Sequence, residues 1–207
     1  MPSVIERASS GRAKCRVCGQ AIAKGEVRFG EALPSAYGEG ESMFWFHVPC
    51  AACARPESLL PVLAETSESI AERAQLEALA QAGIAQPRLG RLLRAERASS
   101  GRAKCRHCRE PIAQGAWRFA LQIFEEGRFT PIGTIHASCG VGYFGVEPPL
   151  ERMKLPGNPL SDAELAEVVQ QMRDGAAHSL TLALPGLAKA SAPEAADAET
   201  ESTRKTS

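Results

Sequence analysis

The sequence predicts an α+β protein built from two small modules in tandem, and two observations carry that prediction. A shift of 90 residues aligns residues 6–30 with residues 96–120, and 17 of these 25 positions are identical. Each copy then continues through short β-prone segments to a His-x-x-Cys motif and an amphipathic stretch with helical periodicity. A repeat of this kind indicates two units of one design rather than a single large domain.

Two β-prone segments in each copy predict an antiparallel sheet. In the first copy they read VRFG (27–30) and MFWFHV (43–48), and in the second WRFALQIF (117–124) and FTPIGTIH (129–136). Turn-forming residues separate the two segments of each pair, as is typical of strands that return beside one another.

Helix signals follow each sheet. Residues 66–83 have helical periodicity, with Thr66 or Ser67 as the N-cap and Gly83 as the stop. Residues 159–175 begin with a capping box formed by Ser161 and Glu164 and end at Gly175. We therefore expect four segments: a first module with its trailing helix (1–84), a basic linker (85–95), a second module with its helix (96–175), and a disordered tail rich in Ala, Ser, Glu and Thr (176–207).

The seven cysteines are expected to bind metal. The first 30 residues carry charges throughout and lack the apolar run of a signal peptide, and no apolar segment is long enough to span a bilayer. These features predict an intracellular protein, in the cytoplasm or nucleoid of a bacterium or the nucleus of a eukaryote, where thiols stay reduced. Modules this small cannot bury a large hydrophobic core, so they need a further source of stability, and a bound metal ion supplies it.

Each copy contains one set of three cysteines and one histidine with the spacing of a zinc site. A two-residue spacer lets both cysteines of a Cys-x-x-Cys reach one ion, and His-x-x-Cys completes a tetrahedral set. Four protein ligands close the site, which is typical of structural zinc. The sequence thus predicts two Zn²⁺ ions, one bound by Cys15, Cys18, His47 and Cys50 and the other by Cys105, Cys108, His136 and Cys139.

Two alternatives compete with this ligand assignment. Cys50 and Cys53 form a Cys-x-x-Cys of their own, so an all-cysteine site would leave His47 unused. The repeat favours His47, because Gly142 stands where Cys53 would map. A thioredoxin-like redox role would need one isolated cysteine pair in a βαβ context, whereas both pairs here match a downstream His-x-x-Cys.

Positive charge gathers around the two Cys-x-x-Cys pairs, although the net charge is zero. Residues 1–30 contain six Lys or Arg against two Glu, and residues 88–120 contain nine against two. The segments that follow each are net acidic. A clustered basic surface indicates an anionic partner better than net charge does.

The lead-ins SGRAKCRVC and SGRAKCRHC resemble the PARP-type zinc finger, found in tandem at the start of nuclear poly(ADP-ribose) polymerases and singly in DNA ligase III. Both copies share the following I-A-x-G-x-x-R-F and a gap of 28 or 27 residues before H-x-x-C. The similarity covers about residues 5–64 and 95–153. It implies a protein that recognises DNA ends, nicks or gaps by their structure, and so a role in DNA damage.

The resemblance also implies which residues contact DNA. Backbone phosphates would be bound by six cations at matched positions, namely Arg12, Lys14 and Arg28 in the first copy and Arg102, Lys104 and Arg118 in the second. The alternative for these cations is a solvated surface. The positions from which the family stacks apolar side chains on exposed bases hold poor platforms here, which are Gly38, Ser42, Gly127 and Pro131. Their apolar neighbours Tyr37, Met43, Phe44, Phe129 and Ile132 are candidate replacements.

We expect no enzymatic activity, because no transferase or ligase domain fits after Met153 and no catalytic pattern stands out. The leading hypothesis is a zinc-dependent protein that binds DNA. RNA is an alternative partner, and an acidic protein bound by a zinc-stapled adaptor is another. An enzyme using zinc or thiols ranks last.

Overall fold

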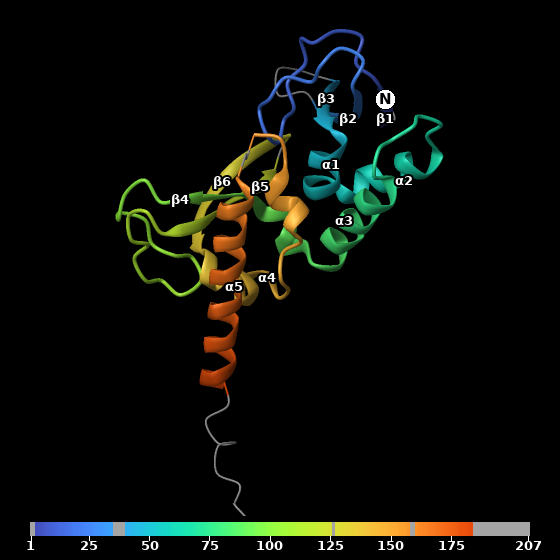
Figure 1. Cartoon of the computed structure of the whole chain (residues 1–207). Helices are drawn as coiled ribbons and strands as arrows, with labels where there is room; N and C mark the ends of the chain where they lie inside the picture. Colours follow the sequence, from blue (N-terminus) through green and yellow to red (C-terminus); the bar gives the residue numbers. More distant parts are fainter. Residues whose placement is uncertain (1–2, 35–39, 126, 158–159, 184–207) are drawn as a thin grey trace, which may run out of the picture.

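Each copy of the repeat folds into a three-stranded antiparallel sheet, and the two sheets share one strand order (Figure 1). The structure is a computed structural model that describes residues 3–34, 40–125, 127–157 and 160–183. The first sheet has the order β1-β2-β3 and the second β4-β5-β6. Their bounds are β1 Val4–Arg7, β2 Val27–Pro34, β3 Glu41–His47, β4 Leu92–Arg97, β5 Trp117–Glu125 and β6 Arg128–His136. The predicted α+β class is confirmed.

The register of the two sheets is the same next to the predicted ligand histidines, His47 and His136. Arg28 pairs with His47 and Phe29 with Phe46 in the first sheet, as Arg118 pairs with His136 in the second. Because side chains alternate across a strand, Phe29 and Phe46 point together into the core, where both are fully buried. The edge strands β1 and β4 were not predicted, because their charged sequence lacks a strand-like apolar pattern.

Three helices follow the first sheet and lie beside it in Figure 1. They are α1 (Val48–Ala54), α2 (Pro56–Glu65) and α3 (Arg73–Ala85). The predicted helix start is wrong: Thr66 is the C-cap of α2, and α3 begins after Glu72, whose φ is 55°. The predicted stop at Gly83 is also wrong, since this glycine lies inside the last turns of α3. Together with β1–β3 these helices form what we call the first module.

The second module, formed by β4–β6 and the elements after them, ends in one long helix. Three short helical segments precede α5 (Asp162–Ala183), namely the 3₁₀ helix η2 (Ala137–Cys139), the α-helix α4 (Gly140–Phe144) and the 3₁₀ helix η3 (Leu150–Lys154). The predicted capping box is present, since the Glu164 N–H donates to Ser161 Oγ (3.3 Å) and the Ser161 N–H to Glu164 Oε2 (2.9 Å).

The helix does not end at Gly175, as predicted, but runs on to Ala183. A Cβ at position 175 would lie 1.9 Å from the Ser138 carbonyl oxygen, so this glycine permits close packing of α5 on η2 rather than a stop. The rest of the predicted tail lies outside the described residues.

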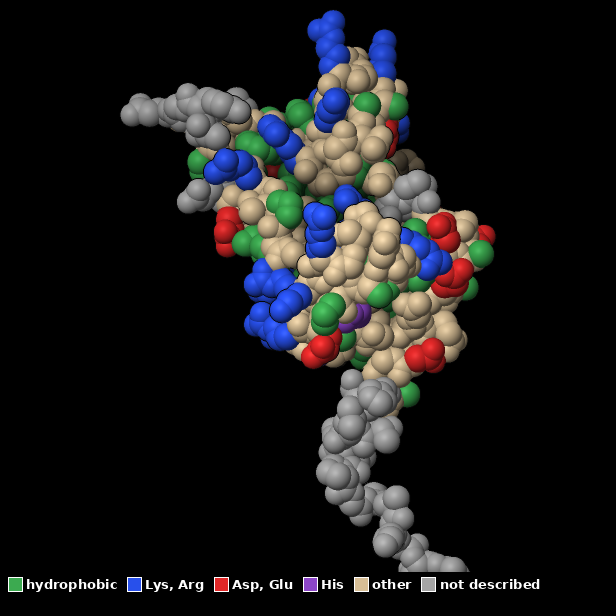
Figure 2. All heavy atoms as spheres, turned by 90° about the vertical axis from the view of Figure 1, so that its left-hand side faces the viewer, with side chains coloured by type: hydrophobic (Ala, Val, Ile, Leu, Met, Phe, Trp, Pro, Cys, Tyr) green, Lys and Arg blue, Asp and Glu red, His purple; other side chains and the backbone are tan. Residues whose placement is uncertain are grey.

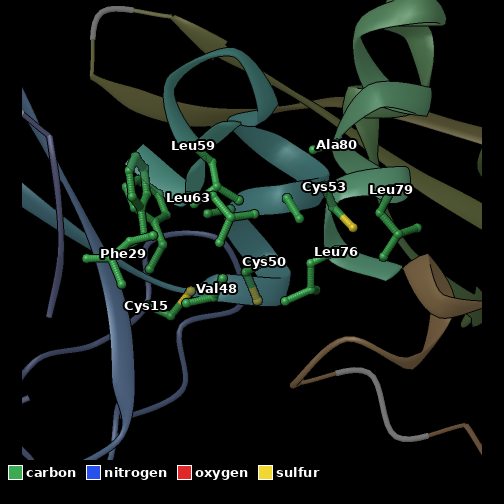
Figure 3. Close-up of a cluster of buried hydrophobic side chains, with 14 of the residues drawn as sticks. Cys15, Phe29, Val48, Cys50, Cys53, Leu59, Leu63, Leu76, Leu79 and Ala80 are labelled. Atoms are coloured by element: carbon green, nitrogen blue, oxygen red, sulfur yellow. The ribbon is translucent and has the colours of Figure 1, made fainter. Parts of the chain in front are cut away.

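Each module has its own buried cluster. In the first, Leu59 and Leu63 of α2 and Leu76 and Leu79 of α3 pack with Phe29 of the sheet (Figure 3). In the second, Phe119 and Ile135 of the sheet meet Phe144 of α4 and Val168 and Met172 of α5. The aromatic pair Phe119–Phe144 is T-shaped, with 5.8 Å between ring centroids.

The two modules are in direct contact. Leu155, which follows η3, is buried in the cluster of the first module, and Phe129 of β6 packs edge-on against Phe46 at 6.4 Å. Arg152 of η3 is 1 % exposed and donates hydrogen bonds to the carbonyls of Cys53 in α1 and of Leu89. The predicted linker 85–95 forms η1 (Pro87–Arg91) and the start of β4, and Leu89 is fully buried.

Candidate metal centres and nucleic-acid interface

In each module a tight turn holds the two cysteines of the Cys-x-x-Cys motif. The Cys15 N–H donates to the Gln20 carbonyl (2.8 Å) and the Gly19 N–H to the Cys15 carbonyl (2.9 Å). Gly19 has a φ of 74°, which glycine adopts without strain. The second module repeats both bonds, with Arg109 in the place of Gly19 at a φ of 70°.

The structure brings the four predicted ligands of each module together. The donor atoms of each set all lie within 4.8 Å of one another. In the first set Nδ1 of His47 lies 3.4 Å from Cys18 Sγ and 3.9 Å from Cys50 Sγ. A tetrahedron with ordinary Zn–S and Zn–N bond lengths has an S···N edge of about 3.6 Å. The second set has the same two distances, 3.4 and 3.9 Å, around His136. Both sets therefore fit Zn²⁺, which would hold the turn against the end of β3 or β6.

In each histidine a hydrogen bond from Nε2 to a backbone carbonyl decides that Nδ1 is the nitrogen that faces the sulfurs. His47 Nε2 lies 3.3 Å from the Ala21 carbonyl oxygen, and His136 Nε2 lies 3.1 Å from that of Pro111. A carbonyl oxygen can only accept a hydrogen bond, so Nε2 carries the hydrogen and donates it, and Nδ1 is left to ligate. This arrangement of a ligating histidine bonded to a backbone carbonyl is common around structural zinc.

Hydrogen bonding within the first set favours thiolate. The hydrogen bond from Cys18 lowers the pKa of Cys15 far below its ordinary value, and hydrogen bonds to Cys15 and Cys18 raise the pKa of His47 to about 10. In the second set burial raises the pKa of Cys105, but N–H groups of Cys108, His136 and His107 lower it overall to about 7. One sulfur in each set is thus prepared to lose its proton, as metal binding requires, and the raised pKa of His47 means that the ion would also displace a proton from Nδ1 of this ring.

The two centres differ in burial. Cys15, His47 and Cys50 are buried, whereas Cys108 is exposed and His136 and Cys139 are only partly covered. The first centre is consequently embedded in its core, and the second lies nearer the surface.

Cys53 stands apart from the metal centre. It is buried in α1, and Figure 3 shows its sulfur on the side of Leu79, apart from the sulfurs of Cys15 and Cys50. Burial raises the pKa of this thiol, which suits a small apolar core residue.

Two closed sets of three cysteines and one histidine on small sheets define a zinc-finger protein. Residues 6–86 match the model of a family described as "Poly(ADP-ribose) polymerase and DNA-Ligase Zn-finger region". The first module is therefore similar to the PARP-type zinc fingers of this family, whose members typically bind DNA. The second set is compatible with a second finger of the same kind. Within the described residues no helix is long and apolar enough to cross a membrane.

Four of the six predicted phosphate contacts are exposed on the zinc turns. Arg12 and Lys14 precede Cys15, and Arg102 and Lys104 precede Cys105. None of these side chains has an ion pair with the residues that the structure describes. Figure 2 shows Lys and Arg side chains spread from the top of the molecule down the face to which the loop between β4 and β5 points, with Asp and Glu mainly at its margins.

The other two predicted contacts are already engaged. Arg28 is 7 % exposed and its Nη2 lies 2.6 Å from Glu6 Oε1, while Arg118 makes the same pair with Glu96 at 2.7 Å. Arg118 has the more exposed side chain of the two. Phosphate contact by these arginines stays a prediction, and it has to compete with a carboxylate that is already bound.

The candidate stacking residues are divided between surface and core. Tyr37 and Gly38 lie outside the described residues. Phe129 packs on Phe46 of the other module and on Phe124 (4.8 Å between centroids), so it is unavailable as a platform. Phe44 is buried. Of the candidates in the first module, Met43 reaches the surface, in a hollow of about 500 Å³ that is otherwise lined by Arg12, Lys14, Cys15, Arg16, Gly19 and Trp45.

Sequence reasoning missed Arg16 and Trp45 in this hollow. A signal was available for Trp45, because residues 43 and 45 alternate with the core residues 44 and 46 and so belong to the opposite face of β3. Arg16 is tied to the same strand, since its N–H donates to the Trp45 carbonyl at 3.0 Å.

Proposed function

We propose that this protein binds DNA through backbone phosphates, that zinc maintains the binding surface, and that it recognises broken duplexes without acting as an enzyme. The observation that supports the proposal is the recurrence of exposed cations, without an ion pair among the described residues, at matched positions on the turns of the two metal centres. Guanidinium and ammonium groups bind phosphate oxygens, and their binding releases counterions whatever the base sequence.

Zinc links the fold to this activity. A bound metal would hold the turn that presents Arg12 and Lys14 against the end of β3, together with the hydrogen bond from the Arg16 N–H to the Trp45 carbonyl. Removing the ion should therefore release Arg12 and Lys14 from their positions as well as unfold the sheet. Reduced thiolate ligands suit an intracellular compartment, which would be the nucleoid or the nucleus according to the source.

Charge-removing substitutions test the phosphate contacts. We expect Arg12→Ala and Arg102→Ala each to weaken binding to duplexes of every sequence and to reduce the slope of log affinity against log salt by about one unit. Gel shifts at two or more salt concentrations measure both effects. Arg173→Ala is the matched control, because it removes the same charge from α5, where Arg173 pairs with Glu147. Equal behaviour of all three variants would favour an adaptor that binds an acidic protein.

A competition assay between nicked and intact duplexes of one sequence tests break recognition. Stacking on an exposed base contributes roughly 1–3 kcal/mol per base. Of the usual stacking positions, Ser42, Gly127 and Pro131 offer no ring, and Gly38 lies outside the described residues. We expect a preference for the nick that is smaller than such stacking would give. Equal affinity would leave a general nucleic-acid binder, and tighter binding to structured RNA in the same assay would redirect the proposal to RNA.

A further inference from the structure

The hollow on the first module has the chemistry of a site for an unstacked nucleotide. Three cations (Arg12, Lys14 and Arg16) surround a thioether and an indole, and the described residues that line it include no Asp or Glu. Its volume of about 500 Å³ lies in the range of about 300–1,000 Å³ typical of small-ligand sites. A positive groove with an aromatic surface is how proteins hold single-stranded nucleic acid, with phosphates on the cations and bases on the ring.

Trp45 is held in place so that one side of its ring stays available. It lies opposite Gly30 in the sheet, and a Cβ on Gly30 would be 2.6 Å from the indole and 2.9 Å from Met43 Sδ. The Arg28 guanidinium carbon lies 3.5 Å from the ring centroid, and Arg28 is itself fixed by Glu6. Arg28 and the Gly30 backbone thus cover the inner side of the ring. Since Trp45 remains partly exposed, its accessible part faces the hollow.

The second module differs at the matching positions. Thr134 pairs with Ala120 as Trp45 pairs with Gly30, so a threonine stands where the first module has an indole. Arg106, the counterpart of Arg16, donates to the Ile132 carbonyl and lies across Gly133, where a Cβ would meet its Cδ at 2.9 Å. The far end of the β5–β6 hairpin is covered as well, because Phe129 and Gly127 contact Phe46 and Phe44 of the first module.

We infer that the first module alone accepts an unstacked nucleotide from a gap or single-stranded end, with its base against Trp45 and Met43 and its phosphates on Arg12, Lys14 and Arg16. The second module then contributes only phosphate contacts. The inference rests on the proposed function, because it names which DNA structure the protein selects and which side chains select it.

Fluorescence of Trp45 reports directly on the site. The chain has two tryptophans, and Trp117 is 2 % exposed with its Nε1 donating to Glu167. In a Trp117→Phe variant, Trp45 is the sole indole emitter. We expect a gapped duplex and a short oligothymidylate to quench this emission, and an intact duplex of the same length to leave it unchanged. Binding of gapped duplex without quenching would overturn the inference.

Substitution at Trp45 gives the second measurement. Trp45→Leu should weaken binding to gapped duplex about tenfold, equivalent to about 1.4 kcal/mol, while affinity for intact duplex stays within about twofold. Trp45→Phe, which keeps a ring, should retain most of the affinity, and Thr134→Leu is the matched control in the second module. Zinc content and circular dichroism establish that each variant is folded.

The outcomes separate this inference from the proposed function. If the unsubstituted protein binds no DNA, the proposed function fails and this inference fails with it. If the protein binds DNA but Trp45→Leu lowers affinity for gapped and intact duplexes equally, or changes neither, the nucleotide site is refuted while the phosphate contacts stand.

Discussion

A methyl group added at Gly83 should destabilise this protein, although the same change stabilises most helices. Gly83 lies buried near the end of α3, and a Cβ there would be 2.9 Å from Arg152 Nη2 and 3.3 Å from Pro56 Cγ. An arginine at the surface would simply move away. Arg152 cannot, because it is 1 % exposed and its two terminal nitrogens donate to the carbonyls of Leu89 and Cys53.

The magnitude follows from two opposing effects. Gly→Ala inside a helix gains up to about 1 kcal/mol of stability. Displacing the guanidinium weakens the 2.9 Å hydrogen bond to the Cys53 carbonyl, and a hydrogen bond of a charged group contributes about 1.5–3 kcal/mol. The Nε of Arg152 has no hydrogen-bond partner among the described residues, and burial lowers the pKa of this side chain, so no other hydrogen bond there would replace the one that is weakened. We expect Gly83→Ala to lower the free energy of unfolding by about 1–2 kcal/mol.

A double-mutant cycle in urea or thermal unfolding of the zinc-loaded protein measures this coupling. In an Arg152→Met background the guanidinium is absent, so Gly83→Ala should become neutral or stabilising by up to about 1 kcal/mol, with a coupling energy of about 1–3 kcal/mol. Gly90→Ala serves as the control, since a Cβ there meets only the Cys53 carbonyl at 4.0 Å. Additive effects, or a stabilising Gly83→Ala in the unsubstituted chain, would refute the role given to Arg152.

Two further predictions concern the metal centres. Elemental analysis should give two zinc ions per chain, with one lost in His47→Ala and none in Cys53→Ala, and a chelator should unfold both modules; the reverse result for the two variants would indicate an all-cysteine site. Arg109→Gly should raise the unfolding temperature of the zinc-loaded protein, because a non-glycine residue at a φ of 70° costs about 1 kcal/mol, and an unchanged temperature would show that Arg109 is not strained.

The sequence was sufficient for the features that depend on short-range patterns. The repeat, the ligand spacing and the alternation in residues 43–46 placed the two metal centres and the paired strands. The two glycines predicted to end helices, Gly83 and Gly175, show what short-range patterns cannot predict. Gly83 and Gly175 both serve close packing, against Arg152 and Ser138, and a glycine looks the same in sequence whether it ends a helix or makes room for a distant neighbour.

The contact between the modules could not be predicted for a similar reason. In the sequence Arg152 resembles the many other charged residues expected at the surface, and Phe129 resembles an ordinary strand residue. Their partners Cys53 and Phe46 are more than 80 residues away, and no local pattern encodes a contact at that separation.

One small feature gives the metal centres a way to influence each other. Gly157 of the second module, at a φ of 85°, lies against the first zinc turn, where a Cβ would be 3.1 Å from the Cys18 carbonyl oxygen and 3.2 Å from Cys18 Cβ. The neighbouring Leu155 is buried in the first module. Loss of the ion from the first centre would loosen the turn that Gly157 contacts, and Gly157 lies five residues before α5, which packs in the buried cluster of the second sheet. Occupancy of the two centres would then be a linked equilibrium, in which binding of one ion raises the affinity for the other.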